Sequence, residues 1–170
     1  MTVKPADSNR ELLCPSAQPG MESAVVFAIA GGTPDAPQMS YIDRPVPATP
    51  EILRLAQPVE PDEVFRIAAK CARHKCVHFT GANCDLARRT VLLLAPVVSA
   101  LPPCRIRPGC RWFAEQGAAA CVRCPQVVTR NFHPTPLIAE AARDLCGSKI
   151  TSDSAQQAAA RVAHRMPSAG

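Results

Sequence analysis

The chain has 170 residues, enough for one ordinary domain, and 47% of them are hydrophobic. It contains only five Phe, one Tyr and one Trp, so each buried side chain removes little area from water. Eighteen prolines also disfavour long regular elements. This composition excludes a large aromatic core and predicts that cross-links through sulfur support the fold.

The formal net charge of +5 is unevenly distributed along the chain. Residues 1–65 carry four basic and nine acidic side chains, whereas residues 66–130 carry eleven basic and two acidic ones. The positive charge therefore accumulates on the segment that also holds most of the cysteines.

Whether the cysteines form disulfides or bind metal depends on the cellular compartment of the protein. The first residues mix Asp7, Arg10 and Glu11 and lack the apolar stretch of a signal peptide, and the longest apolar run, 24–30, is too short to span a bilayer. We therefore expect a cytoplasmic protein without membrane association, in which thiols stay reduced. Nine cysteines, an odd number, also fit a closed disulfide framework poorly, so metal binding is the better interpretation.

The first third of the chain predicts a β-hairpin. Residues 1–20 have the composition of a flexible arm. The β-branched run 24–30 predicts a strand, 31–37 a turn, and the alternating residues 38–42 a returning strand. Residues 43–50, with three prolines, predict an extended connector.

Helical signals follow. A short helix is expected over 50–56, and another should begin at Pro61, with acidic residues in its first turn. Its apolar stripe would comprise Val64, Ile67, Ala68 and Cys71. A further helix should begin at Asn83 as N-cap and end before Pro96.

The last part of the chain shows weaker patterns. Residues 101–130 have little periodicity and predict an irregular segment, whereas 136–146 predict a helix stopped by the following glycine. A last helix or frayed tail is expected over 152–165. The predicted fold is thus a small, irregular, cysteine-rich and metal-stabilised α+β domain over 21–147, with an N-terminal hairpin, three or four short helices, and a helical or disordered tail over 148–170.

Seven of the nine cysteines fall within fifty-four residues, with the spacing Cys71-x4-Cys76-x7-Cys84 and Cys104-x5-Cys110-x10-Cys121-x2-Cys124. Four of them lie in the segment expected to be irregular, where metal ligation would fix the chain in place of secondary structure. Cys14 is a further candidate, and with it the cysteines suffice for two four-cysteine clusters. Cys146 on its predicted helix is instead expected in the core, since cysteine is often buried.

The spacing leaves the metal open. Structural zinc usually uses two short knuckles, and Cys71-x4-Cys76 with Cys121-x2-Cys124 would form only one such site. Iron–sulfur clusters accept ligands from separate loops, so one or two [4Fe–4S] clusters are favoured, with zinc as the alternative and redox thiols third. His74 or His78 could replace one thiolate, although a solvated histidine is the commoner case.

Basic residues near the candidate ligands support thiolates, because positive charge lowers thiol pKa values and offsets the charge of a loaded site. Those closest in sequence are Arg73, Lys75, Arg88, Arg89, Arg105, Arg107, Arg111 and Arg123. The same charge, with Trp112 and Phe113 as a stacking surface, would also suit nucleic acid.

No pattern for an independent enzyme is visible. The cysteine-rich segment holds only Asp85 and Glu115 as carboxylates, and Gly31-Gly32 does not form a dinucleotide-binding motif. The sequence therefore predicts an iron–sulfur protein for one-electron transfer or redox sensing, accessory to a larger enzyme and docking an acidic redox partner protein or enzyme subunit. The alternative is a zinc-stabilised module that binds nucleic acid or protein.

Overall fold

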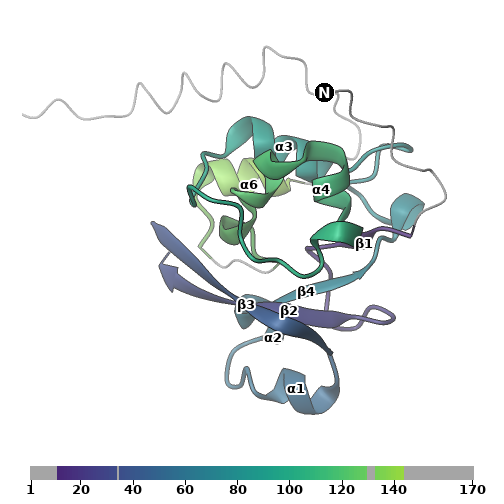
Figure 1. Cartoon of the computed structure of the whole chain (residues 1–170), viewed down its shortest axis with the longest axis vertical. Coiled ribbons are helices and arrows are strands. Elements are labelled where there is room, and N and C mark those ends of the chain that lie inside the picture. The colour runs from purple at the N-terminus through teal and green to yellow at the C-terminus, as the bar shows by residue number, and fades with distance from the viewer. Residues whose placement is uncertain (1–10, 34, 130–132, 144–170) are drawn as a thin grey trace, which may run out of the picture.

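The computed structural model describes residues 11–33, 35–129 and 133–143. Its centre is a four-stranded antiparallel sheet in the order β1-β4-β2-β3, which short helices flank (Figure 1). The strands are β1 (Leu13–Cys14), β2 (Val25–Thr33), β3 (Ala36–Pro47) and β4 (Phe65–Lys70). The α+β class expected from the sequence is confirmed at this level.

The predicted hairpin is present and longer than expected. β2 pairs with β3 from Val25↔Pro47 to Thr33↔Ala36, with an irregularity between Val26 and Ala28. Gly32 in its turn has φ +80°, and a Cβ there would lie 2.3 Å from the Ala36 carbonyl oxygen, so the turn needs glycine. Residues 43–47 of the expected connector belong to β3 instead. β3 is an edge strand, and edge strands tolerate proline because one side of their backbone needs no partner.

The segment after Pro61 differs from its prediction. Helix α2 covers only Pro61–Val64, and 65–70 form β4, the inner strand between β1 and β2. Five of the six β4 residues are buried, because an inner strand is covered on both faces. A strand that is buried on both faces does not alternate between apolar and polar residues. The apolar residues of β4 therefore matched the spacing of one face of a helix. Cys71 thus follows a strand and does not lie on a helix.

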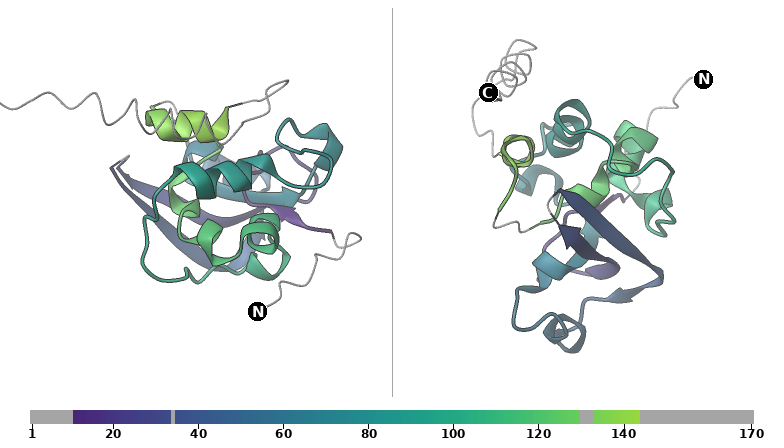
Figure 2. Two further views of the ribbon diagram at one scale, coloured as in Figure 1. Left: turned by 90° about the horizontal axis from the view of Figure 1, so that it is seen from above. Right: turned by 90° about the vertical axis from the view of Figure 1, so that its left-hand side faces the viewer.

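Helices lie on both sides of the sheet. Helices α1 and α2 lie on one side of the sheet, whereas α3, α4, α5 and α6 gather on the other side (Figures 1 and 2). Their bounds are α1 (Pro50–Arg54), α3 (Asp85–Leu93), α4 (Arg111–Gln116), α5 (Ala118–Cys121) and α6 (Pro136–Ala142). Three 3-10 turns complete the described elements: η1 (Arg73–Lys75), η2 (Arg107–Gly109) and η3 (Cys124–Gln126).

Two predictions about the helices need correction. The described residues form six α-helices where three or four were expected, because α4 and α5 lie in the segment 101–130 that was expected to be irregular. These helices span six and four residues, too few for periodicity to reveal them. The N-cap of α3 is Cys84, one residue after the predicted one. Cys146 and 152–165 lie outside the described residues.

The N-terminal segment also differs from its prediction. Residues 1–20 were expected to form a flexible arm, but Leu13 and Cys14 pair with Lys70 and Ala69 of β4. The neighbouring Ala17 is 1% exposed and donates its backbone N–H to the Ile67 carbonyl. From residue 11 onward this segment is therefore part of the sheet layer. In the part of the chain that the structure describes, the helices are all too short or too polar to cross a membrane.

Three groups of buried side chains hold these layers together. Val26, Phe65 and Ile67 pack on the α1 side, and Leu86 and Trp112 belong to the core among the helices. A third, small group lies around Phe27, Ala28, Ala68 and Ile106, with Cys104 against it.

Candidate metal centre

The fold gathers the eight described cysteines into two sets of four. The first set is Cys14, Cys71, Cys76 and Cys84; the second set is Cys104, Cys110, Cys121 and Cys124. All eight are free thiols. The sets do not follow the knuckle pairing considered from the sequence, because Cys71 and Cys76 lie in one set and Cys121 and Cys124 in the other.

The first set is assembled by the edge of the sheet and the start of α3. Cys14 lies in β1, and the Cys71 backbone N–H donates to the Leu12 carbonyl at 2.9 Å, which places the end of β4 beside it. Cys76 caps η1, and Cys84 is the N-cap of α3. Four short segments therefore bring the four cysteines into one region of the fold.

Burial governs the pKa values of two thiols of the first set, and the other cysteines of the set add smaller effects. Burial raises the pKa of Cys14 from 9.0 to about 12; a hydrogen bond from the Ser16 backbone lowers it, and negative charge on Cys84, Cys71 and Cys76 raises it. Burial likewise raises the pKa of Cys84 to about 11, with smaller effects that include the charges of Glu115, Cys71 and Cys76. Without metal the thiols of Cys14 and Cys84 are therefore neutral at pH 7, and metal binding there must release their protons.

A buried ion pair on α4 supports the first set. Arg111 Nη1 lies 2.5 Å from Glu115 Oε1, and the two side chains are 7% and 8% exposed. Glu115 Oε2 also accepts the Cys84 backbone N–H at 2.7 Å. Burial would lower the pKa of Arg111, but its hydrogen bonds to Glu115 and Cys71 and the negative charge on both raise it. The pair thereby connects two cysteines of the set.

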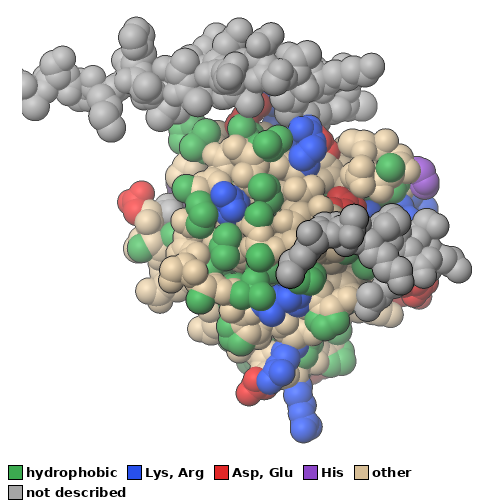
Figure 3. Space-filling view, turned by 45° about the horizontal axis from the view of Figure 1, so that its top comes forward, with side chains coloured by type: hydrophobic (Ala, Val, Ile, Leu, Met, Phe, Trp, Pro, Cys, Tyr) green, Lys and Arg blue, Asp and Glu red, His purple; other side chains and the backbone are tan. Residues whose placement is uncertain are grey.

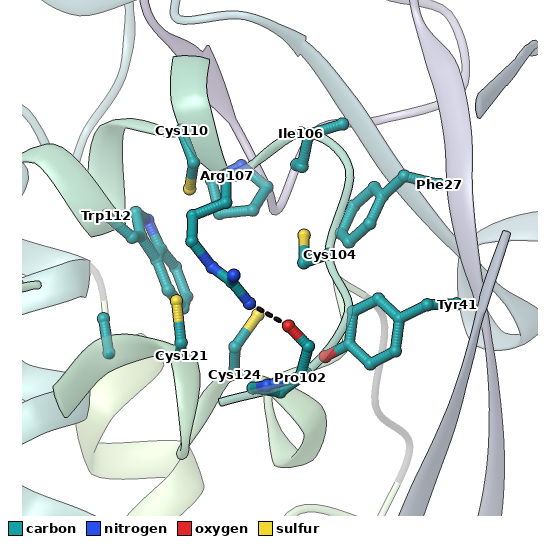
Figure 4. Close-up of a pocket in the computed structure, with 12 residues that line it drawn as sticks. Phe27, Tyr41, Pro102, Cys104, Ile106, Arg107, Cys110, Trp112, Cys121 and Cys124 are labelled. Atoms are coloured by element: carbon teal, nitrogen blue, oxygen red, sulfur yellow. Dashed lines mark hydrogen bonds between the residues drawn. The ribbon is translucent and has the colours of Figure 1, made fainter. Parts of the chain in front are cut away.

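The second set surrounds a small cavity between the helices and the sheet. Cys110 is the N-cap of α4, Cys121 ends α5 and Cys124 begins η3. Figure 4 shows these thiols and Cys104 around the side chain of Arg107, which donates a hydrogen bond to the Pro102 carbonyl. The cavity left beside this side chain has a volume of about 20 Å³. A cluster bound here would therefore require the Arg107 side chain to move aside.

The second set is partly buried: Cys110 is 7% exposed, and Cys104, Cys121 and Cys124 are half-buried. Burial raises the pKa of Cys110 to about 12, partly offset by a hydrogen bond from the Phe113 backbone, and burial also raises the pKa values of Cys104 and Cys121. For Cys121, hydrogen bonding and charge from Arg107 oppose this rise. Tyr41 lines the same cavity, and burial raises the pKa of its hydroxyl above its usual range.

A fully buried arginine lies beside the second set. Arg66 of β4 is 0% exposed, and its Nη2 lies 3.3 Å from Cys124 Sγ. Its other hydrogen bonds go to the backbone carbonyls of Pro15, Cys124 and Val127. Among the described residues no carboxylate pairs with it. Sequence reasoning missed Arg66, because 58 residues separate it from Cys124 and only the strand assignment of β4 brings the two together.

A buried donor without a hydrogen-bond partner lies in the wall of the same cavity. Trp112 is 1% exposed and lines the cavity, and its indole N–H has no acceptor among the described residues. A buried unsatisfied N–H costs about 1–3 kcal/mol. Sulfide and thiolate sulfurs of a bound cluster would supply acceptors here, so the residues of this site fit such a group. The Trp112 ring is buried against this site and does not offer the exposed stacking surface that the nucleic-acid alternative considered.

The other candidate ligands lie apart from these arrangements. His74 makes an edge-to-face contact with Phe79 at 5.0 Å, and His78 Nδ1 lies 3.1 Å from Arg89 Nη2. Within residues 11–33, 35–129 and 133–143, no three His, Cys, Asp or Glu side chains meet closely enough to hold one metal ion. Comparison with protein families, with curated proteins and with solved structures found no match.

Proposed function

We propose that the chain binds two [4Fe–4S] clusters, one on each four-cysteine set, and acts as a one-electron carrier or redox sensor accessory to a larger enzyme. The observation that carries this proposal is the division of the eight described cysteines into two separate sets of four. Four thiolates are the usual complement of one such cluster, and clusters accept ligands from different segments.

The surroundings of the second set support a cluster over neutral thiols. Arg66 is a buried cation whose described partners are neutral carbonyls and the Cys124 sulfur. A buried charge without a counterion is costly, and a loaded four-thiolate cluster carries net negative charge. Figure 4 shows the four sulfurs around the Arg107 side chain, so they could supply the four thiolates of one cluster once this side chain moves aside.

The two carboxylates of the cysteine-rich segment are engaged in ion pairs, which is consistent with an electron carrier. Asp85 lies 2.6 Å from Arg88 Nη2 and 3.1 Å from Arg89 Nε, and Glu115 pairs with Arg111. Both acids therefore serve the start of α3 and the wall of the first set. An electron carrier requires no general acid or base of its own.

For the partner, we propose an acidic redox protein or enzyme subunit. Three of the basic residues between 66 and 130 are buried, namely Arg66, Arg89 and Arg111. On the face shown in Figure 3, Lys and Arg side chains are spaced among hydrophobic ones and do not form a continuous stripe. Protein partners bind through such mixed surfaces, whereas nucleic acid needs a dense track of positive charge.

Metal analysis of anaerobically purified protein tests the proposal. We expect a brown protein with about eight iron and about eight sulfide ions per chain, corresponding to two four-iron clusters. Dithionite should bleach its visible absorption and produce an electron paramagnetic resonance signal. A colourless protein that holds stoichiometric zinc would establish the rival, a zinc-stabilised binding module, and end the iron–sulfur proposal.

Serine variants test the two sets separately. Cys84→Ser should remove iron from the first set only and Cys110→Ser from the second only, so each should retain about half of the iron. Cys146→Ser is the matched control, because the sequence predicts Cys146 in the core, on a helix, so its loss should leave the iron content unchanged. Loss of all iron from either single variant would contradict two independent clusters.

A further inference from the structure

Charges near the first set are largely neutralised by acidic partners. The buried Arg111 is paired with Glu115, and Asp85, next to Cys84, holds Arg88 and Arg89. On the surface beside this set, Lys70 bonds to Glu11, and the positive charges of Lys70 and Arg73 lower the pKa of Glu11, the Lys70 hydrogen bond contributing most. The first set thus has little uncompensated positive charge in its buried surroundings.

The second set has the opposite surroundings. Arg66 and Arg107 make their described side-chain hydrogen bonds to carbonyl or sulfur acceptors, and Arg123, between two of the thiols, donates to the carbonyls of Leu94 and Ala119. Of the arginines near this set, Arg105 has an acidic partner, Asp43, and that pair is exposed. Within the described residues, Arg66, Arg107 and Arg123 therefore pair with no carboxylate, and Arg66 is the fully buried one that contacts a sulfur of this set.

This difference in surrounding charge between the two sets affects how easily a cluster on each set is reduced. When a [4Fe–4S]2+ core accepts one electron it becomes [4Fe–4S]+, no bond breaks, and the site gains one negative charge. An uncompensated buried cation stabilises that added charge strongly, because the surroundings screen it poorly. Net charge and hydrogen bonds to the sulfurs are known determinants of cluster potential. The donors at the second set are Arg66 to Cys124 and the unpartnered N–H of Trp112.

We infer that the two centres are electronically unequal: the cluster on the second set has the higher potential, and Arg66 is the positioning and charge-compensating residue that sets it. This inference rests on the proposed function. An electron delivered by an external low-potential one-electron donor therefore comes to rest on the second set, and the first set is the centre that is reduced last. The Arg66 guanidinium contacts a sulfur of the second set, Cys124 Sγ at 3.3 Å, whereas toward the first set it bonds only to the backbone carbonyl of Pro15.

A redox titration of the full chain with dithionite, followed by electron paramagnetic resonance, tests the inference. We expect two separate one-electron steps. Arg66→Gln removes the buried charge and should lower the potential of the upper step while the lower step stays in place. Arg66→Lys retains the charge and should restore part of the shift. Glu115→Gln removes the negative charge beside the first set, keeps an amide acceptor for the Cys84 N–H, and should raise the lower step only.

The outcomes separate this inference from the proposed function. A colourless protein without iron refutes the proposed function itself. Two clusters with coincident steps, or a Glu115→Gln variant that shifts the upper step, overturn the inference while iron–sulfur binding stands. About four irons and a single step per chain also overturn it. If Arg66→Gln does not fold, the Glu115→Gln variant alone tests the inference. A rise in the potential of the lower step only supports the inference, and any other shift contradicts it.

Discussion

Replacing Glu115 with alanine removes an acceptor that two buried donors share. Its carboxylate lies 2.5 Å from the Arg111 guanidinium and accepts the Cys84 backbone N–H at 2.7 Å. Glu115→Ala leaves both without it, and Arg111 remains a cation that is 7% exposed. Breaking a buried pair by removing one partner costs about 3–5 kcal/mol. A domain of this size is stable by about 5–15 kcal/mol, so the loss is a large fraction.

Urea unfolding, followed by circular dichroism under anaerobic conditions, measures this cost. With a denaturant slope of about 2 kcal/mol per molar, typical for a small protein, the midpoint should fall by about 2 M. The double variant Arg111→Met with Glu115→Leu removes both charges and should be less destabilised than Glu115→Ala, because no unpaired ion remains.

An exposed ion pair provides the matched control. Glu51 lies 3.7 Å from Arg54, and the two side chains are 72% and 63% exposed, so Glu51→Ala should cost less than about 1 kcal/mol. The reasoning is refuted if Glu115→Ala costs no more than this control, or if the double variant is destabilised as much as the single one.

The remaining predictions concern pH, the cavity wall and a helix cap. In metal-free protein, burial raises the pKa values of Cys14, Cys84 and Cys110 above 9.0. The unfolded chain therefore loses these protons first, and stability measured by urea unfolding should be full below pH 9 and fall from pH 9 toward 12; an unchanged midpoint would contradict this. Trp112→Phe should lower the potential of the upper step in the titration without loss of iron, because it removes an N–H donor; an unmoved step argues against that bond. Thr135→Ala removes the hydroxyl that accepts the Ile138 N–H at the start of α6 and should cost about 1 kcal/mol with iron content unchanged, unless α6 helps to hold a cluster.

Local sequence patterns predicted the hairpin and α3, because the signals for each of these elements lie in neighbouring residues. Alternation and turn glycines indicated β2 and β3, and an apolar run ended by Pro96 indicated α3. The helical reading of 61–71 failed, since the inner strand β4 is buried on both faces and its apolar residues also match a helical stripe. α4 and α5 are too short for any period to show.

The candidate ligands could be found by counting cysteines, but their grouping could not. Cys14 joins the first set only because β1 pairs with β4, a contact across more than fifty residues. Arg66 meets Cys124 through side-chain contacts across 58 positions of the chain, so the residue proposed to govern one centre has no local sequence signal. Which cysteines share a site remains a prediction until metal analysis tests it.

The placement of the cysteines along the chain also bears on the order of assembly during synthesis. The first set closes a span of 71 residues, from 14 to 84, and the second a span of 21, from 104 to 124. Closing the longer span costs about 1 kcal/mol more in chain entropy. All ligands of the first set nevertheless leave the ribosome before any ligand of the second, whereas Arg111 and Glu115, which complete its wall, emerge later. A cluster delivered early would thus wait, partly open to water, until α4 folds over it.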